Sequence, residues 1–324
     1  MTMSSPGKKL YTVLIVPLII FLVLPIFAGS YLLHIMIFIF FYAYLSQCWN
    51  ILSGYTGQFS LGHAAFLGVG AYTSSFLFSQ YSLTPWVGMF IGALVSLCVG
   101  LFIGHICFRF GLKGAFFALA TMAFAEILRI LFLNLPSMGG AQGLLLPLRG
   151  NAPLLYQFEG KAPFYYIALI MMLVSVAVAY AIERSKTGFY FKAIHQNEES
   201  AEALGVDTKK YKVIAVGLSA AMTAFGGTFF AQYFMYIQPD NTYSTFVSFD
   251  IMLRSIIGGM GTVAGPVIGS FILTPLAEIT RSFLGGKSGA HLMIYGLILM
   301  AVCIFLPQGV YPGIKKWLTR FQSE

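Results

Sequence analysis

The chain is dominated by apolar segments about as long as a bilayer is thick. A spanning helix needs about 20 predominantly apolar residues, and the 324-residue sequence offers such runs repeatedly, for example at 11–30, 31–52 and 164–182. Charged side chains make up only 9% of the residues, against about 25% in an ordinary soluble domain. The sequence therefore predicts an all-α, polytopic integral membrane protein.

The apolar segments predict about ten transmembrane or partly re-entrant helices within one transmembrane domain over residues 1–324. In chain order they lie at 11–30, 31–52, 57–79, 86–108, 115–134, 164–182, 213–236, 246–261, 263–283 and 290–306. Segments 57–79 and 246–261 are glycine-rich or polar at one end. Each of these two is therefore interpreted either as a full span or as a re-entrant or broken helix.

Basic residues lie in short segments between the apolar runs, so the net charge of +8 is interpreted as a topology signal and not as a nucleic-acid surface. Ten crossings place Lys8, Lys9, the 109–113 turn, the 183–212 loop and the basic 307–324 tail on one side. The positive-inside rule assigns that side, and with it both termini, to the cytoplasm. The four cysteines lack CxxC spacing, which indicates neither a disulfide framework nor a metal site.

A glycine-rich stretch, GYTGQFSLGHAAFLGVGAY at 54–72, interrupts the apolar pattern. Small residues three and four apart are typical of tight helix packing in lipid. Polar side chains beside helix-breaking glycines are instead typical of backbone that lines a pathway. Both interpretations stay open, and the pathway candidates are Gly57, Gln58, Ser60 and His63.

A second glycine-rich stretch, IIGGMGTVAGPVIGS at 256–270, stands in the C-terminal half much as the first stands in the N-terminal half. The correspondence predicts a diverged internal repeat. It adds Gly258, Gly259 and Gly261 to the pathway candidates.

The longest polar loop, 183–212, contains NEESAEALG at 197–205, which predicts a short helix. Asn197 can cap its start, Glu198 and Glu199 suit the positive end of its dipole, and Gly205 can close it in a left-handed conformation. Ala201 and Leu204, three apart, predict a small apolar knob on this helix.

Three pairs of opposite charges stand three or four residues apart within or beside the apolar segments. They are Glu126 with Arg129, Asp250 with Arg254, and Glu278 with Arg281. Structural ion pairing is the favoured interpretation, and proton coupling is the alternative. The nearby RSFLGGKSG at 281–289 lacks the first glycine of a phosphate-binding loop, because that position holds Arg281.

Three ordered blocks resemble the LivM-type permeases, the membrane subunits of branched-chain amino acid ABC importers. They are the 54–72 stretch, GFYFKAIHQNEESAEALGVDTKKYKVIAVGLSAAMTAFGG at 188–227, and SIIGGMGTVAGPVIGSF at 255–271. The resemblance implies a multi-pass permease of the bacterial cytoplasmic (inner) membrane that is not itself an enzyme and imports a hydrophobic amino acid by alternating access. It implies no cofactor on this chain and no nucleic acid partner.

By the same resemblance, the partners are a homologous second permease subunit, an extracytoplasmic substrate-binding protein and two ATPase subunits that bind ATP and magnesium. The 183–212 loop then corresponds to the coupling loop that docks into the ATPase, through Glu198, Glu199, Ala201, Ala203, Leu204 and Gly205. The chain departs from the general ABC permease signature here, because 206–212 lacks the expected proline-containing stretch.

Two other classes of protein are left open. An ion- or proton-coupled secondary transporter would act as a single polypeptide, with Glu126, Asp250 or Glu278 titrating. A scaffold subunit would have no pathway at all.

Overall fold

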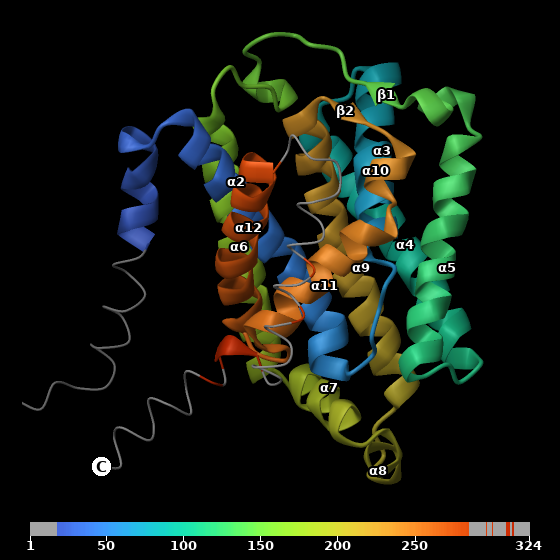
Figure 1. Cartoon of the computed structure of the whole chain (residues 1–324). Helices are drawn as coiled ribbons and strands as arrows, with labels where there is room; N and C mark the ends of the chain where they lie inside the picture. The colour runs from blue at the N-terminus through green and yellow to red at the C-terminus, as the bar shows by residue number, and fades with distance from the viewer. Residues whose placement is uncertain (1–17, 285–295, 297–299, 301–308, 312, 314–324) are drawn as a thin grey trace, which may run out of the picture.

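The computed structural model describes residues 18–284, 296, 300, 309–311 and 313 of the chain. Within these residues the protein is a bundle of helices with one two-residue strand pair (Figure 1). An apolar helix at Leu18–Phe27 precedes the labelled elements. The α-helices are α2 (Ser30–Trp49), α3 (His63–Tyr81), α4 (Pro85–Arg109), α5 (Gly114–Leu133), α6 (Lys161–Arg184), α7 (Lys186–Gln196), α8 (Glu198–Ala203), α9 (Thr208–Phe234), α10 (Pro239–Thr242), α11 (Thr245–Gly259) and α12 (Gly265–Leu284).

Short elements connect these helices. A π-helical turn, η1 (Asn50–Gly54), extends α2. The connection between α5 and α6 contains η2 (Pro136–Met138), η3 (Gly140–Gln142) and η4 (Pro153–Leu155). Strand β1 (Leu144–Leu145) pairs antiparallel with β2 (Tyr236–Ile237), with Leu144 opposite Ile237.

Five helical segments are long and apolar enough to cross a membrane, by length and composition. They are Ser30–Gly54, Pro85–Arg109, Gly114–Leu133, Lys161–Arg184 and Thr208–Phe234. The protein is an all-α polytopic membrane protein, as the composition predicts. The predicted span 290–306 and the tail 307–324 lie largely outside the described residues.

The two segments that could be full spans or broken helices, 57–79 and 246–261, differ from each other. In the first, residues 57–62 are not helical and α3 begins only at His63, with 19 residues. In the second, α11 has 15 residues, a length of about 22 Å, which is short of the roughly 30 Å hydrocarbon core. The predicted break is therefore found before α3, and α11 is a partial span.

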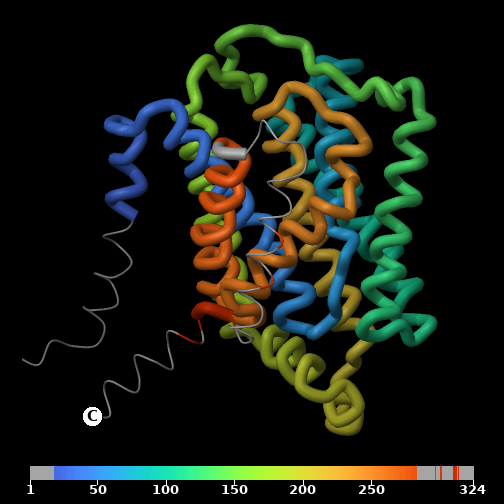
Figure 2. The backbone as a smooth tube through the Cα atoms, viewed as in Figure 1, coloured from blue at the N-terminus to red at the C-terminus, as the bar shows by residue number. Residues whose placement is uncertain are grey.

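The two ends of the bundle collect different loops (Figures 1 and 2). At the α7–α8 end, the turn between α4 and α5 meets α8 through a 3.5 Å ion pair between Lys113 and Glu198. At the opposite end, Tyr236 donates to the Gln142 carbonyl at 2.8 Å. The predicted grouping of the 109–113 and 183–212 loops is confirmed, and the cytoplasmic placement of their end stays a prediction.

The core forms where α9 packs against α2, α3 and α4. Glycine permits the closest approach, because a Cβ on Gly227 of α9 would lie 2.0 Å from the Leu67 carbonyl oxygen of α3. In the same contact, a Cβ on Gly70 would lie 2.2 Å from the Ala224 carbonyl oxygen. The helix-packing interpretation of the first glycine-rich stretch is therefore confirmed at Gly70.

Candidate functional site

The two glycine-rich stretches meet at the side chain of Asn50. The π-helical turn that ends α2 directs this amide toward the turn between α11 and α12. The Asn50 Oδ1 accepts from the Gly261 backbone N–H at 2.8 Å, and its Nδ2 donates to the Thr262 carbonyl at 2.9 Å. A Cβ on Gly54 would lie 2.8 Å from the Gly261 nitrogen, so only glycine permits this backbone approach.

Helix α7 closes over the same point. The His195 Nδ1 lies 2.9 Å from the Gly54 carbonyl oxygen. A Cβ on Gly57 would lie 3.4 Å from the His195 ring, and Gly57 has φ +72°, a conformation that favours glycine. We call Asn50, Gly54, Gly57, His195 and Gly261 the glycine junction. It links α2, α7 and the α11–α12 turn, because the side chains of Asn50 and His195 hydrogen-bond to backbone groups.

The other candidates of the second glycine-rich stretch shape the α11–α12 turn. A Cβ on Gly258 would lie 1.7 Å from the Gly265 carbonyl oxygen, so the two helices leave the turn in close contact. Gly259 has φ +126° and Gly261 has φ +76°. These glycines therefore have a conformational role, and their role in a pathway stays a prediction.

The polar candidates of the first stretch lie inside the chain. Ser60 and His63 are fully buried, and Gln58 is buried. The His63 Nε2 is 2.8 Å from the Ser219 Oγ, and the Ser60 carbonyl accepts from the Trp49 indole at 2.8 Å. The His63 Nδ1 and the Gln58 Oε1 have no hydrogen-bond partner among the described residues. In the isolated chain these groups join α2, α3 and α9, and their pathway role stays a prediction.

The predicted helix at 197–205 is present as α8, and both predicted caps are confirmed. The Asn197 Oδ1 accepts from the Ser200 backbone N–H at 2.8 Å. Gly205 has φ +84°, the left-handed conformation expected just after a helix end.

The predicted apolar knob is wrong in one respect. Leu204 has a relative exposure of 86%, but Ala201 is buried, because α8 packs against α7 and α9. The outward surface of α8 therefore comes from Leu204 with its exposed neighbours, Glu199, Ala203 and Gly205.

Glu198 faces inward and anchors α8. Its carboxylate lies 2.5 Å from the Lys212 Nζ on α9 and 3.5 Å from the Lys113 Nζ. The Lys212 side chain is only 3% exposed, and its ammonium lies 4.7 Å from the centre of the Phe108 ring. Sequence reasoning missed this anchor, because Lys212 stands at the polar start of α9 and resembles an ordinary loop charge.

The three predicted ion pairs are all formed. Arg129 binds Glu126 through two nitrogens, at 2.9 and 2.6 Å, and also binds Asp240. Arg281 lies 3.3 Å from Glu278.

The third pair is the most enclosed. Arg254 is buried and lies 2.6 Å from Asp250. Its guanidinium also lies 3.8 Å from the centre of the Tyr42 ring, where a cation–π contact adds to the ion pair.

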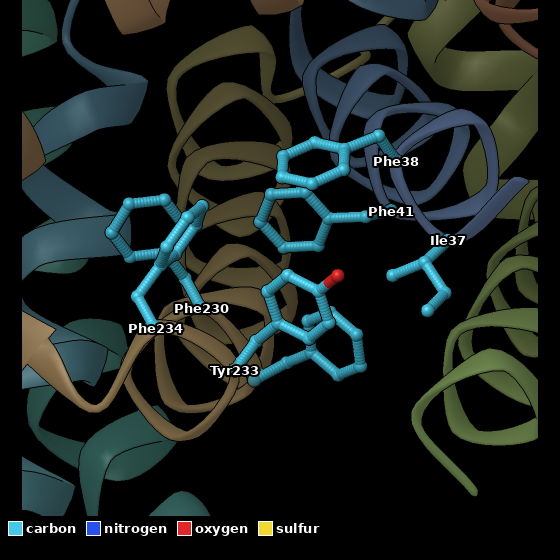
Figure 3. Close-up of a pocket in the computed structure, with 7 residues that line it drawn as sticks. Ile37, Phe38, Phe41, Phe230, Tyr233 and Phe234 are labelled. Atoms are coloured by element: carbon cyan, nitrogen blue, oxygen red, sulfur yellow. The ribbon is translucent and has the colours of Figure 1, made fainter. Parts of the chain in front are cut away.

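Aromatic side chains of α2 and α9 face one another in a narrow crevice (Figure 3). Its lining is Ile37, Phe38, Phe41, Phe229, Phe230, Tyr233 and Phe234. The crevice has no room for a water molecule, so it is a packing contact and not a substrate cavity. At its edge, Tyr233 and His34 of the two helices form a 2.6 Å hydrogen bond.

Titratable side chains near the candidate site are dispersed. Over the part of the chain that the structure describes, no group of three or more His, Cys, Asp or Glu residues could hold a metal ion. Most of the RSFLGGKSG segment lies outside that part.

Burial raises the pKa of the Tyr55 phenol, beside the glycine junction, well above its ordinary value. The phenol therefore stays neutral.

Comparison with known proteins decides the family. Residues 31–303 match the model of the branched-chain amino acid transport system permease component. The chain belongs to this permease family.

The similar curated proteins agree with that assignment. LivM, the high-affinity branched-chain amino acid transport system permease protein of Escherichia coli, is 27% identical over 83% of this chain and 67% of its own length. LivM of Salmonella typhimurium is 28% identical over the same shares. LsrC, the autoinducer 2 import system permease protein of Photorhabdus laumondii, is 28% identical over 68% of this chain and 64% of its own length. No solved structure gives a significant match.

Proposed function

We propose that this permease is one of two membrane subunits of an ABC importer in the bacterial cytoplasmic membrane. In this proposal, a binding protein delivers a branched-chain amino acid to the outer end of the bundle, and two ATPase subunits bind the α7–α8 end. The ATPases bind ATP and magnesium and hydrolyse the ATP. This chain changes conformation and catalyses no reaction. The names of the LivM relatives support the substrate class.

The observation that carries the proposal is the path from α8 to the interior. Leu204 and its exposed neighbours supply an outward surface at the tip of the loop. Glu198 ties that surface to α9 and to the α4–α5 turn. His195, on the adjoining α7, belongs to the glycine junction through its hydrogen bond with the Gly54 carbonyl. A displacement of α8 by an ATPase therefore has a short, contiguous route to α2, α9 and the α11–α12 turn.

The polar groups suit this proposal better than a secondary transporter. A proton-coupled carrier needs carboxylates free to change protonation within the membrane. Here Glu126, Asp250 and Glu278 each lie in an ion pair with arginine, so none of the three is the unpaired carboxylate that such a carrier needs.

A matched pair of leucine substitutions tests the docking surface. Leu204→Asp places a charge on the α8 tip, and we expect the ATPase subunits to be lost on copurification. Leu154→Asp makes the same change at the opposite end, where Leu154 is 84% exposed, and ATPase association should be unchanged. Equal ATPase recovery from the two variants and the wild type would remove α8 as the docking element.

Ala201 is unsuitable for this test. Because its side chain is buried, Ala201→Arg would disturb the packing of α8 and report on folding instead of docking.

A further inference from the structure

The triad of Glu126, Arg129 and Asp240 occupies an unusual position for charged groups. Glu126 and Arg129 belong to α5, which is apolar enough to span the membrane. They stand about 18 and 22 Å above its first residue, Gly114, at 1.5 Å per residue. Both therefore lie within the thickness of a bilayer about 30 Å deep.

These charges are nevertheless accessible in the isolated chain. The side chains of Glu126 and Asp240 are 45% and 50% exposed, and that of Arg129 is 26% exposed. Charges at this depth are costly in contact with lipid, so they face protein or water. The exposed side of the triad must therefore face the partner permease or an aqueous pathway.

The triad also sits where three helical elements of different length converge. Aromatic stacking of Phe132 on Tyr243, with ring centres 5.1 Å apart, fixes the end of α10 against α5. Helix α11, a partial span, follows directly. Short and broken helices at membrane depth are typical of backbone that lines a cavity in transporters, which favours water over lipid in front of the triad.

The hydrogen-bonding capacity of the triad is only partly used. Arginine has five N–H donors, and the contacts of Arg129 with Glu126 and Asp240 engage three of them within the described residues. Each carboxylate can accept several hydrogen bonds. The group can therefore bind a carboxylate through Arg129 and an ammonium through Glu126 or Asp240 at the same time.

We propose that Glu126, Arg129 and Asp240 form a binding site for the zwitterionic head group of an α-amino acid in the outer half of the pathway. The inference rests on the proposed function, because it needs an aqueous path beside α5. It places substrate recognition on exposed charges and not on Gln58, Ser60 or His63, which are enclosed in this chain. The selectivity of the site is for the paired charges that all α-amino acids share.

Cysteine protection in the assembled transporter tests the site. Ile130 lies one helical turn from Glu126, on the exposed side of α5. In nanodiscs holding the permease pair and the ATPases, we expect the thiol introduced by Ile130→Cys to react with a membrane-impermeant methanethiosulfonate. Ile170→Cys, on an exposed apolar position of α6, is the lipid-facing control and should not react. The wild-type complex sets the background from native cysteines.

Ligands that lack one charge make the test specific. Millimolar leucine should slow the labelling of the Ile130→Cys variant several-fold, with or without ATP, whereas isopentylamine and 4-methylpentanoate should not. Adding Arg129→Gln to that variant should abolish the protection. Asp240→Asn keeps an acceptor oxygen for Arg129 but removes the charge, so it should weaken the protection by roughly tenfold in leucine concentration. If the triad has only a structural role, leucine should slow the labelling to the same extent whether residue 240 is the native Asp240 or carries Asp240→Asn.

Two results would overturn the site. An Ile130→Cys thiol as unreactive as that of Ile170→Cys would mean that protein covers this face of α5. Labelling that leucine does not slow, or slows equally after Arg129→Gln, would mean that no zwitterion binds there. ATP-dependent uptake by the wild-type complex keeps the two proposals apart: uptake without protection rejects this site alone, and no uptake rejects the proposed function.

Discussion

The interior around α9 and the α7–α8 unit differ in how much of their surface contacts the rest of the chain. In the interior, polar groups such as His63 and Ser219 form hydrogen bonds across helices, and glycines bring backbones into contact. In the α7–α8 unit, Glu198 and His195 bind the inner side to the rest of the bundle, and Leu204 is left outside. The difference indicates that the interior holds the fold together, and it supports the proposal that α8 meets another protein.

The largest effect is expected at the close contact between α3 and α9 in the interior. Gly227→Val puts a branched side chain where a Cβ would already lie 2.0 Å from the Leu67 carbonyl oxygen. We expect a loss of about 3 kcal/mol in the free energy of unfolding, measured by denaturation in mixed micelles. Gly160→Val is the control, because nothing lies within 4 Å of a Cβ there. Equal stability of the two variants would contradict the close α3–α9 contact.

A smaller effect is expected at the anchor between the two regions. Glu198→Ala leaves the Lys212 ammonium buried without its nearest carboxylate, which should cost about 2 kcal/mol. Adding Lys212→Met removes the buried charge and should restore most of the stability. A double-mutant cycle on the same unfolding assay measures this coupling. Additive losses would mean that the pair does not hold α8 in place.

The smallest effect is expected on the outward surface of the α7–α8 unit. Lys192 pairs with Glu183 at 2.7 Å, but both side chains are more than a third exposed. Solvent screens such a pair, so Lys192→Ala should change stability by less than about 0.5 kcal/mol. A loss of stability as large as that of Glu198→Ala would mean that the outward ion pair stabilises the fold as much as the buried one does.

Much of the fold follows from the sequence, because apolar length and short-range capping are local properties. The membrane class, the loop grouping, the α8 caps and the three ion pairs could all be predicted this way. The glycine junction could not, since Asn50 meets Gly261 from a distant part of the chain and its π-helical turn has no sequence signature. The inward side of α8 could not be predicted either. Ala201 and Leu204 stand three residues apart, which predicts one shared face, but Ala201 is buried and Leu204 is exposed.

Uptake of radiolabelled leucine into proteoliposomes tests the central claim most directly. The vesicles would hold this permease with its partner permease and ATPases, with binding protein outside and ATP present or absent inside. We expect accumulation that requires ATP and every partner and is lost in Leu204→Asp. Leucine accumulation by this chain alone, driven by an imposed proton or sodium gradient, would contradict the account.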